Sequence, residues 1–159
     1  MSGYREPSPR EHWTLGEIES EIRRLAVIVG AREDDLPTFD QQDGYSGRPN
    51  IEPAPWSPGG FAYVSIERGQ ENERSTFTTV DDLLFRVFDS VTFDVACRYE
   101  LAHRVPDEDC RRMLFAKQVE LLERLSPAWG QRGRERKEAI LREHPFDDAA
   151  TVRGRSRSR

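Results

Sequence analysis

The sequence predicts an α+β fold, in which an N-terminal helix is followed by a small antiparallel sheet of three or four strands, a C-terminal helical hairpin and a further helix. Two observations predict it. Apolar residues recur every three or four positions over residues 15–29 and again over 80–125, whereas the stretch between alternates apolar and polar residues and is rich in glycine and proline. Because the strands follow one another between the helices, this order argues against a doubly wound parallel sheet.

The length of 159 residues is that of about one domain with a single core. We predict a flexible lead-in over residues 1–12, a single α+β domain over 13–149 and a disordered arginine-serine tail over 150–159. No window approaches the roughly 18 apolar residues of a membrane span, and the N-terminus lacks the apolar core of a signal peptide. We therefore expect a cytoplasmic protein that does not engage a membrane.

The first helix has signals at both ends. Thr14 and Glu17 form a capping box, and Gly30 suits the left-handed position that closes a helix. Between them, one apolar face is traced by Leu15, Ile18, Ile22, Leu25, Ala26 and Val29. This pattern predicts an amphipathic helix.

The sheet is predicted from short extended segments. Residues 36–39 are predicted to form a short strand. An irregular loop, rich in glycine and proline, follows over residues 41–60 and contains one short extended segment near Ile51. Residues 61–68 alternate, with Ala62, Val64 and Ile66 on one face. Residues 69–73 are predicted to form a turn, and residues 74–78, which are rich in β-branched side chains, to return as the paired strand.

The longest apolar periodicity runs through two helices joined near Pro106. Thr79 and Asp82 cap the first of them, over residues 80–104. Its apolar stripe consists of Val80, Leu84, Val87, Phe88, Val91, Val95, Tyr99 and Ala102. Phe93 and Cys97 lie on the opposite side, which predicts that the middle of this helix is buried from two directions. The second helix buries Cys110, Leu114, Phe115, Leu121, Leu122 and Leu125, and Ser126 with Pro127 begins a third, which bears Trp129, Ile140 and Leu141.

Catalytic, metal and cofactor motifs are absent from the sequence, so we expect no enzyme and no cofactor. Glu100 and His103 have the Glu-x-x-His spacing of di-iron bundles, but no second copy exists, and an ion pair at the surface or at the hairpin end is favoured. The three histidines do not assemble a catalytic site. Cys97 and Cys110 have no metal-ligand spacing and are expected to be reduced, buried thiols.

Two polar side chains interrupt the apolar side of the second hairpin helix. Arg111 and Gln118 lie seven positions apart, and we expect them to be satisfied internally, across the hairpin with groups such as Glu100, although a partner is the alternative. Further on, Phe146 in residues 144–148 is positioned to fold back against the body.

Several segments together resemble a known family. They are residues 36–39, 63–69, 81–84, 91–93 (Val-Thr-Phe), 99–101, 111–118 (Arg-Arg-Met-Leu-Phe-Ala-Lys-Gln) and 144–148 (His-Pro-Phe-Asp-Asp). Over residues 15–148 the chain resembles the immunity protein 63 family of bacterial polymorphic toxin systems. The resemblance implies an intracellular antidote that binds a cognate toxin domain and blocks it. The proline-rich lead-in, the loop before Phe61 and the arginine-serine tail depart from the family pattern.

The charge of the chain bears on its partners. The formal net charge is -5, and removing the four arginines of residues 153–159 leaves -9 on residues 1–152. So acidic a body repels nucleic acid and suits a basic protein partner. We predict that the partner-binding surface lies on the strand side and comprises Asp40, Asp43, Tyr45, Trp56, Glu67, Glu71 and Glu73, a mixture of acids and aromatic anchors. Its alternative is that Trp56 folds over the core and the acids are simply solvated.

Two other functions stay open at this point. One is a small regulatory or nucleic-acid-binding module that uses the tail arginines Arg153, Arg155, Arg157 and Arg159 for weak phosphate contacts, and the other is an undetected enzyme.

Overall fold

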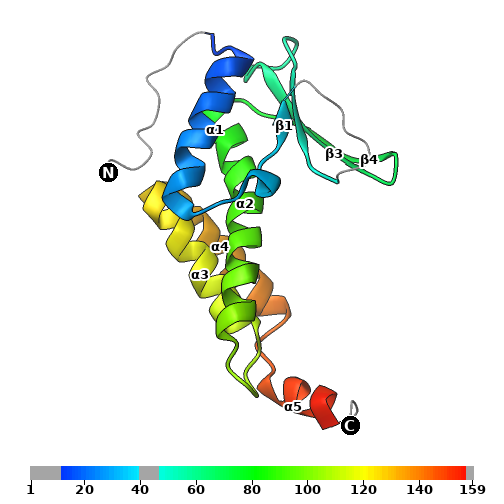
Figure 1. The fold of residues 1–159 in the computed structure, drawn as a ribbon, viewed down its shortest axis with the longest axis vertical. Helices are drawn as coiled ribbons and strands as arrows, with labels where there is room; N and C mark the ends of the chain where they lie inside the picture. The colour runs from blue at the N-terminus through cyan, green and yellow to red at the C-terminus, as the bar shows by residue number, and fades with distance from the viewer. Residues whose placement is uncertain (1–11, 40–46, 157–159) are drawn as a thin grey trace. The chain divides into compact units, whose positions relative to one another are not determined.

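The computed structural model describes residues 12–39 and 47–156 of the chain. It confirms the α+β class: a helix, a four-stranded sheet and four further helices follow in that order (Figure 1). The chain divides into two compact units, residues 1–91 (unit 1) and residues 92–159 (unit 2), with the division inside a long helix. None of the helices in the described ranges combines the length and the apolar character that a membrane span requires.

Unit 1 begins with helix α1 (Leu15–Val29), whose predicted ends are confirmed. Glu17 N–H donates to Thr14 Oγ1 at 3.2 Å and Thr14 N–H to the Glu17 carboxylate at 2.9 Å, while Gly30 closes the helix in the left-handed region with φ 68°. The predicted apolar face is buried at Ile18, Ile22, Leu25, Ala26 and Val29. A short 3₁₀ turn, η1 (Glu33–Asp35), follows and is tied back to α1 by Arg23 and Glu33, 2.6 Å apart.

The sheet has the order β1-β2-β3-β4, from β1 (Thr38–Phe39), β2 (Asn50–Pro53), β3 (Phe61–Glu67) and β4 (Gln70–Thr76). Its β2–β3 and β3–β4 pairs are antiparallel as predicted, but β1 runs parallel to β2, with Thr38 opposite Asn50. The sequence pattern could not reveal this difference, because alternation fixes which face a side chain occupies and not the direction of the neighbouring strand. A parallel pair needs a long connection, which the stretch before Asn50 supplies.

Strands β3 and β4 form a longer hairpin than predicted, with a two-residue turn in place of the turn over residues 69–73. Arg68 and Gly69 both have positive φ, 51° and 76°, which matches the twist of a tight hairpin. The register shifts beyond Ser65, so that Glu73 faces Ser65 and Glu71 faces Ile66, and Asn72 forms a bulge between them. Figure 1 shows the hairpin extending past the shorter strands.

Helix α2 (Val80–His103) starts at the predicted cap, where Asp82 N–H donates to Thr79 Oγ1 at 3.1 Å. Within unit 1 it buries Leu83, Leu84, Phe85, Val87, Phe88 and Val91. Within unit 2 the buried face is instead Thr92, Ala96 and Glu100, four residues apart. The predicted burial from two directions is therefore wrong, because Phe93 is 42% exposed; Tyr99, which was predicted to lie in the apolar stripe, is 37% exposed. Both rings lie at the solvent margin, under Lys137 and Lys117 respectively.

Unit 2 also contains α3 (Arg111–Leu125) and α4 (Pro127–Glu143), which lie side by side as an antiparallel pair. The predicted cap of α4 is confirmed, since Ser126 Oγ accepts from Trp129 N–H at 3.4 Å. Trp129 is 1% exposed and Leu121, Leu122 and Leu125 of α3 are buried. Ile140, another apolar residue of this helix, is 41% exposed.

The disordered tail predicted over residues 150–159 differs in the part that the structure describes, because Asp148–Ser156 is a helix, α5, whereas residues 157–159 lie outside the described residues. Asp147 Oδ1 accepts from Ala150 N–H at 2.8 Å and so caps the first turn. Asp148 in turn bonds the Asp109 N–H at 2.8 Å and Arg112 at 3.0 Å. These contacts fix the start of α5 to the start of α3, and periodicity within the tail does not indicate them. The single-domain boundaries over residues 13–149 stay a prediction.

Candidate partner-binding surface

The described residues of the predicted surface all belong to unit 1. Trp56 lies in the loop between β2 and β3, Glu67 ends β3, and Glu71 and Glu73 lie in β4. Asp40, Asp43 and Tyr45 lie outside the described residues. The structure therefore describes four of these residues and does not bring them all together: the three glutamates lie toward the β3–β4 turn, whereas Trp56 lies in the loop at the other end of β3.

Trp56 is presented to solvent by an ordered loop. Its side chain is 73% exposed, whereas Trp129 is only 1% exposed. The loop is closed by backbone hydrogen bonds from Ala54 N–H to Gly60 O at 2.8 Å and from Ser57 N–H to Ala54 O at 2.9 Å. The alternative that Trp56 folds over the core is wrong.

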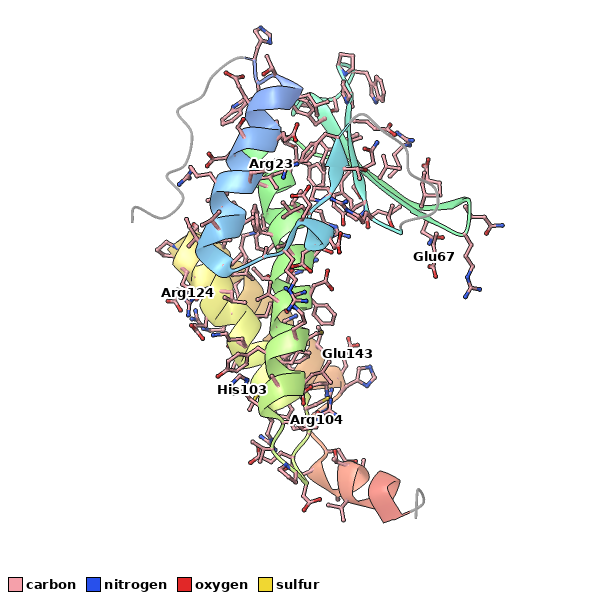
Figure 2. All side chains as sticks on the ribbon, in the orientation of Figure 1. Arg23, Glu67, His103, Arg104, Arg124 and Glu143 are labelled. Atoms are coloured by element: carbon pink, nitrogen blue, oxygen red, sulfur yellow. The ribbon has the colours of Figure 1, made fainter. Side chains whose placement is uncertain are left out.

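The three acids differ in how far their charge is compensated. Glu71 binds Arg74 at 2.9 Å, and Arg74 also binds Glu52 of β2 at 2.9 Å. Glu73 binds Arg86 of α2 at 2.6 Å. Glu67 accepts a hydrogen bond from the neutral side chain of Asn72 at 3.2 Å, which leaves its charge uncompensated by that contact. Glu67 projects at the end of the hairpin (Figure 2).

The pair of Glu73 and Arg86 is part of the architecture of unit 1. The hydrogen bonds from the Arg86 guanidinium lower the pKa of the Glu73 carboxyl. The same guanidinium lies 4.2 Å above the ring of Tyr63, so it connects α2 to both strands of the hairpin. Glu73 is therefore half-buried and less available to a partner than the sequence suggested.

Charge is unevenly divided between the units. Residues 1–91 contain 9 Lys and Arg against 17 Asp and Glu, a net charge of -8, whereas residues 92–159 contain 15 against 12, a net charge of +3. The acidity that the sequence indicated for the whole body is thus concentrated in unit 1. The candidate surface lies in that acidic unit.

Glu100 and His103 do not converge on a common site. Glu100 is buried and receives two hydrogen bonds of 2.8 Å from Arg104, an ion pair that lowers the pKa of the Glu100 carboxyl. His103 Nδ1 lies 2.8 Å from Tyr99 O, and its ring stacks on that tyrosine. The favoured ion pair at the hairpin end therefore forms with Arg104 and not with His103. Among the described residues, no group of three or more His, Cys, Asp or Glu side chains is arranged to hold a metal ion.

The cysteines are both free thiols, but they are not both buried as expected. Cys110 is exposed, and Cys97 is half-buried. Burial, followed by the nearby Asp94 and Glu100 carboxylates, raises the pKa of the Cys97 thiol. A raised pKa keeps this thiol protonated and poorly nucleophilic.

Sequence reasoning missed the residue that organises the start of α3. Asp109 is buried and accepts hydrogen bonds from Arg111 at 2.7 Å and from Asp147 N–H at 3.0 Å. Arg111 also donates to His144 O and Pro145 O, both at 2.9 Å. Arg111 is thus satisfied internally as predicted, though by the segment after α4 and not by Glu100. The available signal was an acid two residues before an arginine at a helix start.

Phe146 folds back as predicted. Its ring centroid lies 6.4 Å from that of Phe115 and 4.4 Å from the Arg112 guanidinium. Together with the contacts of Arg111 and Asp109, this packing explains why residues 144–148 return to the start of α3.

A comparison with protein families decides the class of the chain. A model described as immunity protein 63 matches residues 57–139, which is 83 of the 159 residues. This chain belongs to the immunity protein 63 family. As a member of that family it is an immunity protein of a toxin system. No curated protein and no solved structure matches it.

The matched region divides the candidate surface of this immunity protein. Glu67, Glu71 and Glu73 lie inside residues 57–139, whereas Trp56 comes one residue before them. The match is also narrower than the resemblance over residues 15–148. The β3–β4 hairpin therefore lies in the family-matched region, and the Trp56 side chain precedes it.

Proposed function

We propose that this immunity protein neutralises a cognate polymorphic toxin domain by binding it directly and covering its active site. The observation that carries the proposal is the concentration of negative charge in unit 1, a net -8 over residues 1–91, in a chain of the immunity protein 63 family. Toxins that act on nucleic acid need a positively charged cleft, and an acidic surface is complementary to such a cleft.

The surface proposed for this contact remains Asp40, Asp43, Tyr45, Trp56, Glu67, Glu71 and Glu73. Trp56 and Glu67 are the members to test first, because Glu71 and Glu73 already bind Arg74 and Arg86. Reversing all three glutamates would break the contact between β4 and α2, so a loss of toxin binding in that variant would have two causes. A single reversal at Glu67 avoids this difficulty.

The test compares Glu67→Lys with Glu138→Lys, a reversal at an exposed position of α4 in unit 2. We expect Glu67→Lys to weaken binding of the purified toxin roughly fivefold, the equivalent of about 1 kcal/mol, mainly through slower association. Glu138→Lys makes the same change in net charge and should leave affinity nearly unaltered. Isothermal titration calorimetry and protection of cells that express the toxin are the measurements. Equal effects of the two variants would contradict a contact through unit 1.

A further inference from the structure

We propose that residues 54–60 form a rigid loop that holds Trp56 ready to enter an apolar pocket of the toxin, and that Gly59 is the positioning residue of this loop. The inference rests on the proposed function, since it takes the toxin as the partner. The backbone of this loop is held by hydrogen bonds, yet its largest side chain, that of Trp56, is 73% exposed.

The loop is anchored at both ends and in the middle. Ala54 is 0% and Ser57 9% exposed, and Gly60 N–H donates to Ser57 O at 3.0 Å. A further bond from Gly59 N–H to Phe77 O, at 2.8 Å, connects the loop to the segment after β4. Little backbone entropy is then lost when Trp56 binds, and a tryptophan has only two side-chain torsions to fix.

Gly59 permits this connection because it has no side chain. A Cβ atom at this position would lie 2.5 Å from Phe77 O and 3.1 Å from Phe77 C. Both neighbours are backbone atoms and cannot rotate away. Any larger residue therefore has to move the loop off Phe77, and Trp56, three residues earlier, moves with it.

The chemistry of the loop indicates its occupant. Residues 53–60 contain no charged side chain, and Pro53, Pro55 and Pro58 are exposed beside Trp56. This apolar projection belongs to a unit of net charge -8. A second copy of the chain would bring two such units together and is disfavoured by repulsion. The fitting partner is a protein with an apolar pocket bordered by basic groups, such as the cleft of a basic toxin. Tryptophan is among the residues that most often contribute the largest share of the binding energy at protein interfaces.

The experiment measures toxin binding and thermal unfolding for Trp56→Ala, Gly59→Ala, the double variant and Val27→Ala. Val27 is the matched control, because it is an apolar side chain of unit 1 that is 72% exposed. We expect Trp56→Ala to raise Kd about 30-fold or more at an unchanged Tm. Gly59→Ala should raise Kd in the wild-type background and have no further effect in the Trp56→Ala background. Val27→Ala should bind like the wild type.

Four outcomes separate the hypotheses. An unchanged Kd for Trp56→Ala, when Glu67→Lys still weakens binding, would overturn the anchor and leave the proposed function standing. A wild-type protein that does not bind the toxin would overturn the proposed function itself. Light scattering that shows a wild-type dimer, dissociated by Trp56→Ala, would assign the loop to a second copy and overturn the toxin as its occupant. If Gly59→Ala raises Kd as much in the Trp56→Ala background as in the wild type, Gly59 does not act by positioning Trp56.

Discussion

Phe88 and Phe93 lie five residues apart on α2 and differ sharply in burial, 0% against 42% exposed. Truncating Phe88 to alanine removes a fully buried ring and should lower the free energy of unfolding by about 3–5 kcal/mol. Phe93→Ala should cost roughly 1 kcal/mol, because its ring has the Lys137 ammonium at 5.9 Å and solvent on the other side. Urea unfolding of both variants measures the difference, and equal losses would restore the burial from two directions that the sequence suggested.

At the candidate surface, the sequence could indicate which residues are suited to bind a partner, but it could not indicate which of their side chains are free to do so. A tryptophan in a proline-rich loop marks an interface candidate in any sequence, but its exposure depends on hydrogen bonds that close the loop around Ser57. Glu73 has its partner, Arg86, 13 residues away on α2. An alternating pattern along β4 gives no indication of that pairing, so Glu71 and Glu73 appeared as available as Glu67.

Two helices approach closely where α4 carries Gly130. A Cβ atom there would lie 2.8 Å from Glu123 Cβ and 2.9 Å from Glu123 Cα of α3, so the contact involves the backbone of the neighbouring helix. Alanine is favoured over glycine within a helix by about 1 kcal/mol. We expect Gly130→Ala to lower Tm nevertheless, because α3 has to move away. Gly16→Ala in α1, where nothing lies within 4 Å of the added atom, is the matched control and should raise Tm.

The connection between the start of α3 and the start of α5 depends on pH. The hydrogen bonds from Arg111, followed by those from the Asp147 and Arg111 amides, hold the pKa of Asp109 well below its usual range. Its folded-state pKa is thus lower than its unfolded-state pKa. The stabilisation is complete above the ordinary carboxyl range and is lost as the pH falls toward the folded-state value.

Because folding lowers the pKa of Asp109, the effect of Asp109→Asn on stability should depend on pH. At pH 7 the variant should lose about 2 kcal/mol of unfolding free energy, since the negative charge is lost and one of the two acceptor oxygens becomes an NH₂ donor that faces the donors of Arg111 and Asp147. As the pH is lowered below about 4, the difference from the wild type should shrink. Thermal melts across this range, with Glu138→Gln as the control, provide the measurement. A difference that grows on acidification would show that the Asp109 pKa is not lowered by folding.

Elements with local signals were predictable, and elements joined by distant partners were not. Helices α1 and α4 follow from Thr14, Glu17 and Ser126, whose caps operate within three residues. Helix α5 instead depends on Asp109 and Asp148, 39 positions apart. The parallel β1–β2 pair also depends on residues that are distant in the sequence, because it places Thr38 opposite Asn50. Local propensity does not indicate this pairing. Fold class was therefore accessible from sequence, and these long-range contacts were not.

At the scale of the whole molecule, the unequal charge of the two units predicts which part of the chain governs association with the toxin. Unit 1 has a net charge of -8 and unit 2 of +3. A basic toxin should be attracted by unit 1 at long range, and the association rate should fall as salt is raised, whereas the apolar contact of Trp56 should be insensitive to salt. Stopped-flow measurements at about 50 and about 300 mM salt test this dependence.

Deleting residues 152–159 then distinguishes an antidote from a nucleic-acid-binding module. The deletion removes four arginines and leaves Asp147 and Asp148, which make the contacts with Asp109 and Arg112. If the toxin is bound through unit 1, its Kd, the salt dependence of association and the protection of cells should be nearly unchanged. If the tail binds phosphates, the wild type should be retained on single-stranded nucleic acid at low salt, and the deletion should abolish that retention. Loss of toxin binding on deletion would contradict the placement of the interface in residues 1–91.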